Sequence, residues 1–254
     1  MTGIRFASIN IEGHRHREAV VSFLRDFKPD VVCFQELFEN DISFFEEALR
    51  MTCSFFPTMQ WNPDVGNSES TSCPEGVGIF SSLPVSNVRK DFYYKSNANL
   101  PTFILGDETT LHRGLLRVTA KKENESYTIG VTHFTRTPDG STSEKQREDL
   151  KNLLKLLADT PEIILCGDFN APRGGEIFTN LSEVYRDNIP PYYTSSLDPK
   201  LHKLQNRKLL MVDGLFSTPG YKVTDAKLSE GVSDHVAVTA CIDANPARSG
   251  TNGY

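Results

Sequence analysis

Polar residues able to do chemistry follow several apolar, strand-like runs of this 254-residue sequence. They are acids, amides and imidazoles: Asn10 with Glu12, Glu36, His133, Asp168 with Asn170, and Asp234 with His235. Buried strands are rigid supports, and the loops just beyond their ends are where α/β proteins place reactive groups. Each residue also has an ordinary alternative, such as a turn, a helix cap or a core histidine, so the prediction of a site depends on the whole group.

The chemistry that these groups could share is hydrolysis of a phosphate ester. An oxygen ligand such as Glu36 suits Mg²⁺ or Mn²⁺ better than zinc. Asp168 could align and deprotonate water, while Asn170 and His235 could donate to phosphoryl oxygens as negative charge develops. Asp213, in the apolar run LLMVDGLF, is a candidate to orient the histidine. Acyl transfer and P-loop chemistry fit less well, because the sequence has neither a GxSxG nor a GxxxxGK[ST] motif.

Short runs rich in Val, Ile, Phe and Thr predict the strands that must position these residues. The predicted strands are 4–9, 31–34, 76–81, 115–121, 126–133, 162–166, 209–216 and 236–242. Apolar residues at helical spacing predict helices over 19–27, 43–51 and around 150–157. Residues 4–36 and 127–170 are each predicted to form a strand, a helix and a second strand, followed by polar residues. This repeated pattern suggests two sheets that meet with the edges that carry these polar residues together.

The ordered motifs resemble those of the endonuclease/exonuclease/phosphatase superfamily, which has the deoxyribonuclease I-like fold. They are Asn10-Ile11-Glu12-Gly13, Gln35-Glu36, Gly78-Ile79-Phe80-Ser81, Thr132-His133, Gly167-Asp168-Phe169-Asn170, Asp213 and Ser233-Asp234-His235. Each motif is weak alone, but together they appear in the family's order and cover residues 4 to about 243. The resemblance implies an α+β fold, a four-layer α/β/β/α sandwich of two mixed β-sheets flanked by helices.

The resemblance also implies a role for each matching residue. Glu36 would be the main Mg²⁺ ligand, with Mn²⁺ as an alternative ion, Asn10 near the metal or the phosphate, and Asp234 completing the metal side. Asp168 would activate the water, and Asn170 would hold the phosphate. Two histidines would complete the catalytic group: His235, oriented by Asp213 to contact the scissile phosphoryl group, and His133, to bind phosphate or protonate the leaving group. Hydrolysis would be direct, by in-line attack of water.

Departures from the family's patterns bear on the substrate. The Thr-His form is closer to deoxyribonuclease I, the sphingomyelinases and the tyrosyl-DNA phosphodiesterases than to the apurinic-site nucleases. Glu12 stands where several relatives carry Asp. Arg113 is a candidate phosphate ligand, with a surface strand cation as an equal alternative.

One loop has a composition suited to nucleic acid. A basic stretch lies beside two tyrosines, and solvated loop charge is the equal alternative. The stretch contains Lys200, His202, Lys203, Arg207 and Lys208, and the tyrosines are Tyr192 and Tyr193. Residues 55–57 and 92–94 could form apolar membrane-contact loops, but core strands are the favoured interpretation.

We therefore expect a metal-dependent phosphodiesterase that acts on a nucleic acid or a nucleic-acid adduct. The alternatives are a phospholipid or inositol-phosphate esterase of sphingomyelinase type, and a catalytically dead binding module. We expect a single domain over residues 1–243, a disordered polar tail over 244–254, and a monomer. The net charge of -6 argues against a protein that coats nucleic acid.

The sequence also carries information about location. No run of about 18 apolar residues is present, and the first residues do not form an export signal, so we expect neither membrane insertion nor secretion. The five cysteines include no CxxC pair, which favours a reducing cytoplasm and leaves a Cys53–Cys73 bridge as an alternative.

Overall fold

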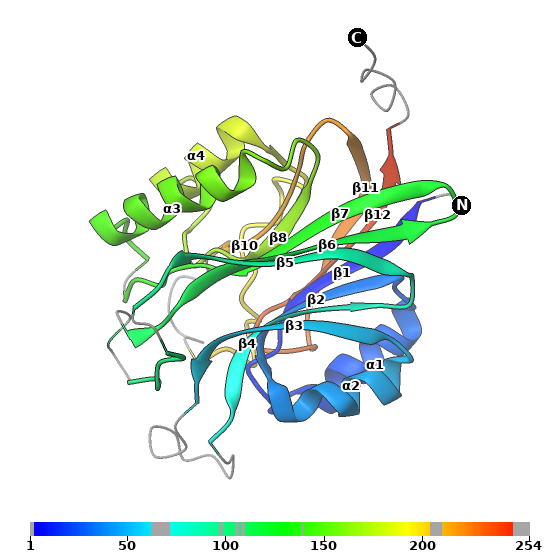
Figure 1. Cartoon of the computed structure of the whole chain (residues 1–254), viewed down its shortest axis with the longest axis horizontal. Coiled ribbons are helices and arrows are strands. Elements are labelled where there is room, and N and C mark those ends of the chain that lie inside the picture. Colours follow the sequence, from blue (N-terminus) through cyan, green and yellow to red (C-terminus); the bar gives the residue numbers. More distant parts are fainter. Residues whose placement is uncertain are drawn as a thin grey trace.

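The computed structural model describes residues 3–61, 72–96, 99–104, 107, 110–138, 140–203 and 210–245. Its first sheet has six strands in the order β11-β12-β1-β2-β4-β3. Their bounds are Ile4–Asn10 (β1), Val31–Phe38 (β2), Thr52–Gln60 (β3), Pro74–Ser81 (β4), Tyr221–Ser229 (β11) and Ala237–Ala244 (β12). β1 and β2 run parallel, and the other neighbours are antiparallel (Figure 1).

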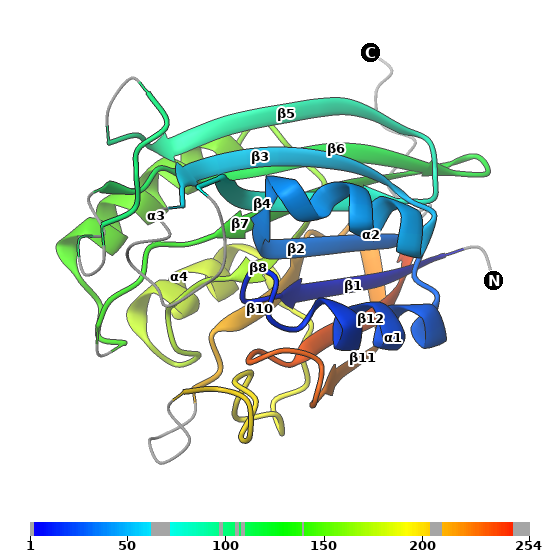
Figure 2. The same cartoon turned by 90° about the horizontal axis from the view of Figure 1, so that it is seen from below.

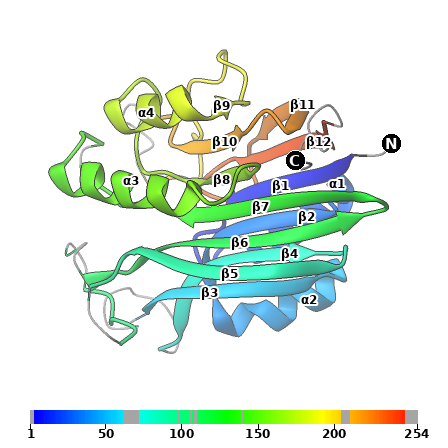
Figure 3. The same cartoon turned by 45° about the horizontal axis from the view of Figure 1, so that its top comes forward.

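The second sheet also has six strands, in the order β5-β6-β7-β8-β10-β9. Their bounds are Val85–Tyr94 (β5), Arg113–Lys122 (β6), Glu125–His133 (β7), Ile164–Asp168 (β8), Arg186–Asp187 (β9) and Asp213–Ser217 (β10). β7 and β8 form its parallel pair. Figure 3 shows the two sheets lying one over the other, and the central apolar core fills the space between them.

In the described part of the chain, four helices cover the outer faces of the two sheets. α1 (Arg17–Phe27) and α2 (Ile42–Leu49), the latter preceded by the 3-10 turn η1 (Glu39–Asp41), pack on the first sheet. α3 (Glu144–Leu157) and α4 (Glu176–Val184) pack on the second, as Figures 1 and 2 show. Each amphipathic helix buries its apolar stripe because the facing sheet offers an apolar surface. The predicted four-layer sandwich of two mixed sheets is confirmed.

The strands that the sequence predicted are the interior strands of both sheets. The four edge strands, β3, β5, β9 and β11, were not predicted as whole elements, although residues 55–57 and 92–94 do lie in β3 and β5 as the core-strand interpretation expected. α4 was also missed. An interior strand is covered on both faces and shows a continuous apolar run, whereas β5 exposes most of residues 86–90 and lacks that signal.

The predicted strand over 209–216 is wrong in its first part. Of the described residues in that range, only those from Asp213 onward belong to β10. The carbonyls of Leu210 and Met211 accept hydrogen bonds from the backbone of Ser196 and Arg173, and the N–H of Val212 donates to the hydroxyl of Ser196. These backbone groups have hydrogen-bond partners in loops, so residues 210–212 do not pair with a neighbouring strand.

Several smaller expectations can also be compared with the structure. All five cysteines are free, so the alternative of a Cys53–Cys73 bridge is wrong. Ala244, counted in the polar tail, is the last residue of β12, and residues 246–254 lie outside the described part of the chain. Among the described residues, no helix is long and apolar enough to cross a membrane.

Gly167 allows β7 and β8 to pair directly beneath the polar edge. Its φ is +143°, and a Cβ there would lie 1.9 Å from the carbonyl oxygen of Thr132. We expect Gly167→Ala to lower the free energy of unfolding by about 3 kcal/mol or more, measured by urea denaturation. Gly174→Ala is the matched control, because its φ of +86° carries strain but no atom lies within 4 Å, so the loss should be about 1 kcal/mol. Equal losses for the two variants would contradict the steric argument.

Candidate active site

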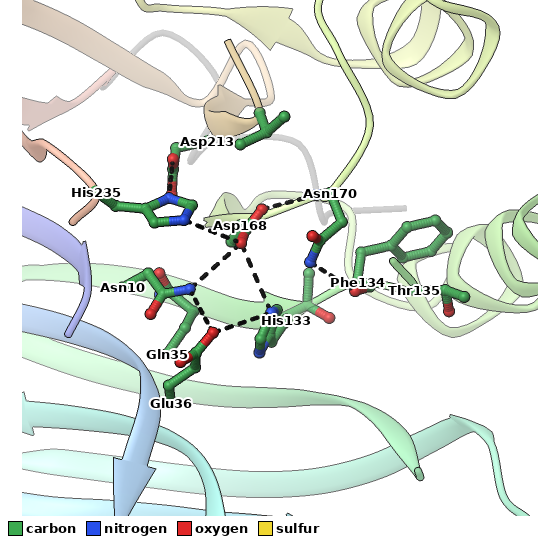
Figure 4. A network of polar contacts seen from close by, with 12 residues as sticks. Asn10, Gln35, Glu36, His133, Phe134, Thr135, Asp168, Asn170, Asp213 and His235 are labelled. Carbon is green, nitrogen blue, oxygen red and sulfur yellow. Dashed lines mark hydrogen bonds and ion pairs between the residues drawn. The ribbon is translucent and has the colours of Figure 1, made fainter. Parts of the chain in front are cut away.

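Strand ends from both sheets meet at one edge of the sandwich. In the first sheet, Asn10 ends β1 and pairs with Gln35 of β2. In the second sheet, His133 ends β7 and pairs with Asp168, the last residue of β8, while Asp213 begins β10 opposite Asp168. His235 comes just before β12 and forms a bridge with Leu197. Figure 4 shows these side chains pointing toward one another.

The carboxylate of Asp168 lies at the centre of this group. Its Oδ2 is 3.3 Å from the Nδ2 of Asn10, 3.6 Å from the Nε2 of His133 and 3.8 Å from the Nε2 of His235. Burial raises the pKa of Asp168 to about 7, and the charge of Asp213 adds to this effect while that of His235 opposes it. The structure thus brings the predicted acid into contact with residues of both sheets.

Asn10 positions two acids through its amide. Its Nδ2 donates to Glu36 Oε1 at 3.0 Å and to Asp168 Oδ2 at 3.3 Å, and its Oδ1 accepts from the backbone N–H of Glu12 at 3.2 Å. The side chain is 1% exposed. Both amide protons and one oxygen lone pair are therefore used within the protein, which suits Asn10 to holding the acids in place more than to strong metal ligation.

Glu36 reaches the site because β2 is irregular at its end. The pairing of β2 with β4 shifts between Phe34 and Leu37, and Glu36 has a φ of +56°. A bulge with one residue in the left-handed region turns a side chain away from the direction that strand alternation would give it. Burial, and next the charge of Asp234, raise the pKa of Glu36.

His235 is held by a hydrogen bond to Asp213. Its Nδ1 lies 2.8 Å from the Oδ2 of Asp213, and both side chains are buried. Burial by itself lowers the pKa of an imidazole, but the carboxylates of Asp213 and Asp168 outweigh it and hold the pKa of His235 well above its usual value. At neutral pH this ring is therefore a cation.

His133 has the opposite electrostatic environment. Burial, followed by the positive charges of Arg113, His235 and Arg136, holds the pKa of His133 well below its usual value. The ring is therefore neutral at pH 7, which suits it to hydrogen bonding with a phosphate more than to giving up a proton. Of the two roles that the resemblance implies for His133, the structure thus favours phosphate binding.

Arg113 is not a surface cation, and that alternative is wrong. The residue is 5% exposed, and its Nη1 donates to the backbone carbonyl of His133 at 3.3 Å. It lies behind the histidine, where its charge acts on the pKa of that ring.

Asn170 and Gln146 connect the two loops of the second sheet that carry site residues. Asn170, with a φ of +48°, donates from its backbone N–H to Asp168 Oδ1 at 2.7 Å and from its Nδ2 to the carbonyl of Phe134 at 3.1 Å. The buried amide of Gln146 donates to the carbonyls of Thr135 at 2.8 Å and Asn170 at 3.4 Å. The start of α3 therefore fixes both loops relative to each other.

Gln146→Leu should damage the site more than the fold. The change keeps the side-chain volume but leaves the carbonyls of Thr135 and Asn170 without this donor and the N–H of Ser143 without its capping-box acceptor, at a cost of about 1–3 kcal/mol in unfolding free energy. We expect a fall in kcat of at least ~10-fold on any phosphoester that the wild type cleaves, because the loops shift apart. Asn152→Ala, on the same helix, is the control and should keep its kcat; an unchanged kcat for Gln146→Leu would contradict the positioning role.

The match to a family model decides which family this chain represents. The model of the endonuclease/exonuclease/phosphatase family matches residues 7–235, which include every site residue described above. The chain belongs to this family. Its members are phosphoesterase hydrolases and generally depend on divalent metal ions.

Solved structures of this family have the same fold. An endonuclease/exonuclease/phosphatase from Bacteroides vulgatus is 15% identical, with 96% of this chain and 100% of that chain covered and a TM-score of 0.71. A mannosyl-6-phosphatase from Bacteroides thetaiotaomicron is 14% identical, with 94% of this chain and 99% of that chain covered and a TM-score of 0.66. ANGEL2, a 2',3'-cyclic phosphatase in complex with adenosine-2',3'-vanadate, is also 14% identical, with 94% of this chain and 95% of that chain covered and a TM-score of 0.66. Comparison of the sequence with curated proteins finds no match.

The family's metal has suitable donors in this chain. Asp234 and Glu12 both contribute to the raised pKa of Glu36, and Glu12 contributes to that of Asp234, so a cation bound near these acids would relieve the repulsion. Two further groups have ligand atoms that all lie within 4.8 Å of one another: Asp168 with Asp213 and His235, and His202 with Asp234 and His235. Among the described residues, neither of these tighter groups includes Glu36.

Two residues of the site were missed by the sequence analysis. Glu75, the second residue of β4, is buried, and burial together with the charge of Glu36 holds its pKa well above the usual value. An acid at the start of the apolar run GVGIFS was a usable signal. His202 was noted only as part of the basic stretch, yet its ring lies 5.9 Å from that of His235. Arg207 and Lys208 of that stretch lie outside the described residues.

Proposed function

We propose that this family member is a Mg²⁺-dependent phosphodiesterase that cleaves a nucleic acid or a nucleic-acid adduct, as nucleases and tyrosyl-DNA phosphodiesterases do. The observation that carries the proposal is the position of the Asp168 Oδ2, within 3.3–3.8 Å of Asn10, His133 and His235, which come from both sheets and from the loop before β12. An acid among hydrogen-bond donors and two imidazoles has the composition that in-line attack of water on a phosphate ester requires.

Asp168 is the residue proposed to accept the proton of the attacking water. A pKa of about 7 suits this task, since a base with a pKa near the working pH is both largely available and strong enough to accept a proton. The backbone N–H of Asn170, 2.7 Å from Oδ1, fixes the carboxylate so that Oδ2 faces the substrate side. Asn10 holds the same oxygen from the first sheet.

His235 and His133 have complementary tasks in this proposal. The cationic His235, oriented by Asp213, stabilises negative charge as it develops on the phosphoryl oxygens and can release a proton to the leaving oxygen. The neutral His133 donates a hydrogen bond to the phosphate. Asn170 uses one amide proton on Phe134 and retains a second for the phosphate.

Glu36 and Asp234 are the proposed Mg²⁺ ligands, with Mn²⁺ as an alternative ion and Asn10 supporting Glu36. A hard divalent cation bound there neutralises charge on the phosphoryl oxygens. Both carboxylates have raised pKa values because they are buried and close to other acids, so each gains from a nearby positive charge.

The loop that contains the basic stretch supports a nucleic-acid substrate. Its described part touches the site, since the backbone N–H of Asp198 donates to the carbonyl of Asp234. Lys200 is exposed and Lys203 is 71% exposed, although Lys203 also pairs with Glu12 at 3.1 Å. Tyr192, on the preceding segment, is 72% exposed and offers a ring on which a base could stack.

A substrate panel with and without metal tests the proposal. We expect the purified protein to cleave plasmid DNA, single-stranded DNA or a 5'-tyrosyl oligonucleotide in Mg²⁺, and to lose all detectable turnover in EDTA. Binding to the same oligonucleotide should weaken steeply as salt rises from 50 to 200 mM, because the loop releases counterions from the phosphates.

The same panel includes sphingomyelin, inositol phosphates and mannose 6-phosphate, which separate the rival functions. Cleavage of only one of these would show that the nucleic-acid proposal is wrong while leaving phosphoester hydrolysis intact. Binding without turnover on every substrate would identify a binding module.

A further inference from the structure

We propose that His202, Asp234 and His235 form a binding site for Zn²⁺ or a similar transition-metal ion, and that this ion inhibits the enzyme. The ring nitrogens of both histidines and a carboxylate oxygen of Asp234 lie within 4.8 Å of one another. The two rings meet edge to face, with centroids 5.9 Å apart and an angle of 76° between their planes. The proposed zinc site is argued from this geometry alone, whereas the proposed inhibition by zinc also depends on the proposed phosphoesterase function.

The loop that carries His202 is fixed against the loop that carries the other two ligands. Asp198 makes the connection: its Oδ1 accepts from the backbone N–H groups of Lys200 and Leu201, and its Oδ2 accepts from that of Gly231 at 2.6 Å. Its own N–H donates to the carbonyl of Asp234 at 2.8 Å. His202 is therefore held beside Asp234 by a tight turn.

His235 is oriented to become a metal ligand when an ion displaces the proton on its Nε2 into solvent. The bond between its Nδ1 and Asp213 Oδ2, at 2.8 Å, uses one ring nitrogen, so the Nε2 is the atom that can coordinate an ion. A carboxylate on the far nitrogen of a metal-binding histidine fixes the ring and makes the ligand more basic. Asp213 provides that support.

The donor types select the ion. Two imidazoles and one carboxylate are typical of zinc sites with an open fourth position, whereas Mg²⁺ prefers oxygen ligands alone. Ligand atoms on a tetrahedral zinc ion lie about 3.3 Å apart, so the cluster must contract slightly. Asp234 and His235 are 8% and 7% exposed, and His202 is half-buried.

Inhibition follows from the shared ligands. An ion on the Nε2 of His235 takes the nitrogen that the proposed mechanism directs at the phosphoryl oxygens, and it neutralises Asp234 on the Mg²⁺ side. His202 is assigned no step in the proposed reaction, although its ring lies beside that of His235. Its replacement should weaken the effect of zinc, which is measured as the zinc concentration that halves each variant's own turnover in Mg²⁺.

Zinc binding is measured first, without substrate, on EDTA-washed protein by competition with a chromophoric chelator. Wild type should bind one Zn²⁺ at this site, and Co²⁺ should give the visible absorption of a four-coordinate ion. His202→Asn should weaken zinc binding at least ~10-fold, and His202→Ala should do the same. His14→Asn is the matched control, because His14 packs against Phe38 outside the cluster. Equal zinc affinity in wild type and both His202 variants would overturn the site.

Inhibition is measured next, on the best substrate at saturating Mg²⁺. Wild type and His14→Asn should lose activity at the same zinc concentration, and His202→Asn should need at least ~10-fold more zinc. If zinc binds the cluster without slowing turnover, the inhibitory role is wrong. If no phosphoester is cleaved at all, the proposed function fails, and the chelator competition still decides the metal site.

Discussion

Asp168→Asn should lower kcat at least ~100-fold, because it removes the group proposed to accept the proton of the attacking water. The change is nearly isosteric, and the Oδ1 of Asn can still accept the backbone N–H of Asn170. The variant also loses the hydrogen bond from Asn10. This loss costs less free energy than is gained by removing a buried negative charge next to Asp213 and Glu36. We therefore expect the variant to fold with an unchanged or higher melting temperature.

The pH dependence of stability provides a second test of the Asp168 environment. Its pKa in the folded state is raised to about 7 from an ordinary value of 3.8, so the folded state binds the proton more tightly than the unfolded state does. For this group, the free energy of unfolding falls as pH rises from about 4 to about 7. In metal-free protein, the melting-temperature advantage of Asp168→Asn should accordingly be larger at pH 7.5 than at pH 4.

Asp91→Asn is the matched control for both measurements. Asp91 pairs with Arg117 on the outer part of the second sheet, away from the strand ends that form the site. Its kcat should equal that of wild type. A folded Asp168→Asn variant with near wild-type kcat would show that Asp168 is not the base.

His235→Ala should also lower kcat at least ~100-fold, because it removes the cation that faces the developing charge. Asp213→Asn should lower kcat at least ~10-fold and should harm folding less than rate, since the Asn side chain still fills the space. Circular dichroism and kinetics on one preparation of each variant measure the two effects together.

A double variant separates a coupled pair from two independent residues. If Asp213 acts only by orienting and charging His235, across their 2.8 Å contact, then Asp213→Asn in the His235→Ala background should cost little more. His14→Asn serves again as the control. Additive losses in the double variant would contradict a shared role.

The sequence predicted the interior of the fold better than its edges. All eight interior strands produced recognisable apolar runs, because each is covered by a neighbouring strand on both sides and by another layer on both faces. The edge strands alternate less clearly and expose polar side chains, and α4 is a nine-residue helix with no side-chain cap. Local pattern therefore gave a weak signal for the edge strands, whereas the apolar stripe of α4 was present in the sequence and was overlooked.

The sequence likewise predicted some residues of the candidate site and missed others. Residues that follow apolar runs, such as Glu36 and Asp168, could be named from the sequence because strand ends are recognisable. Glu75 had the same kind of signal and was overlooked. The positions of His202 and Arg113 could not be predicted, since their importance comes from neighbours on other strands and loops. The pKa differences between the two histidines likewise depend on which charges lie beside each ring.

By itself, the sequence determined which residue types stand at the ends of which buried strands, and so the class of chemistry that they could perform. Only the tertiary structure decided that Asn10 and Asp168, 158 positions apart, share a hydrogen bond. The physical reason is that strand formation is read from local periodicity, whereas the meeting of two sheets depends on apolar burial between them. That burial, and the charges it brings together, sets the protonation states on which the proposed reaction depends.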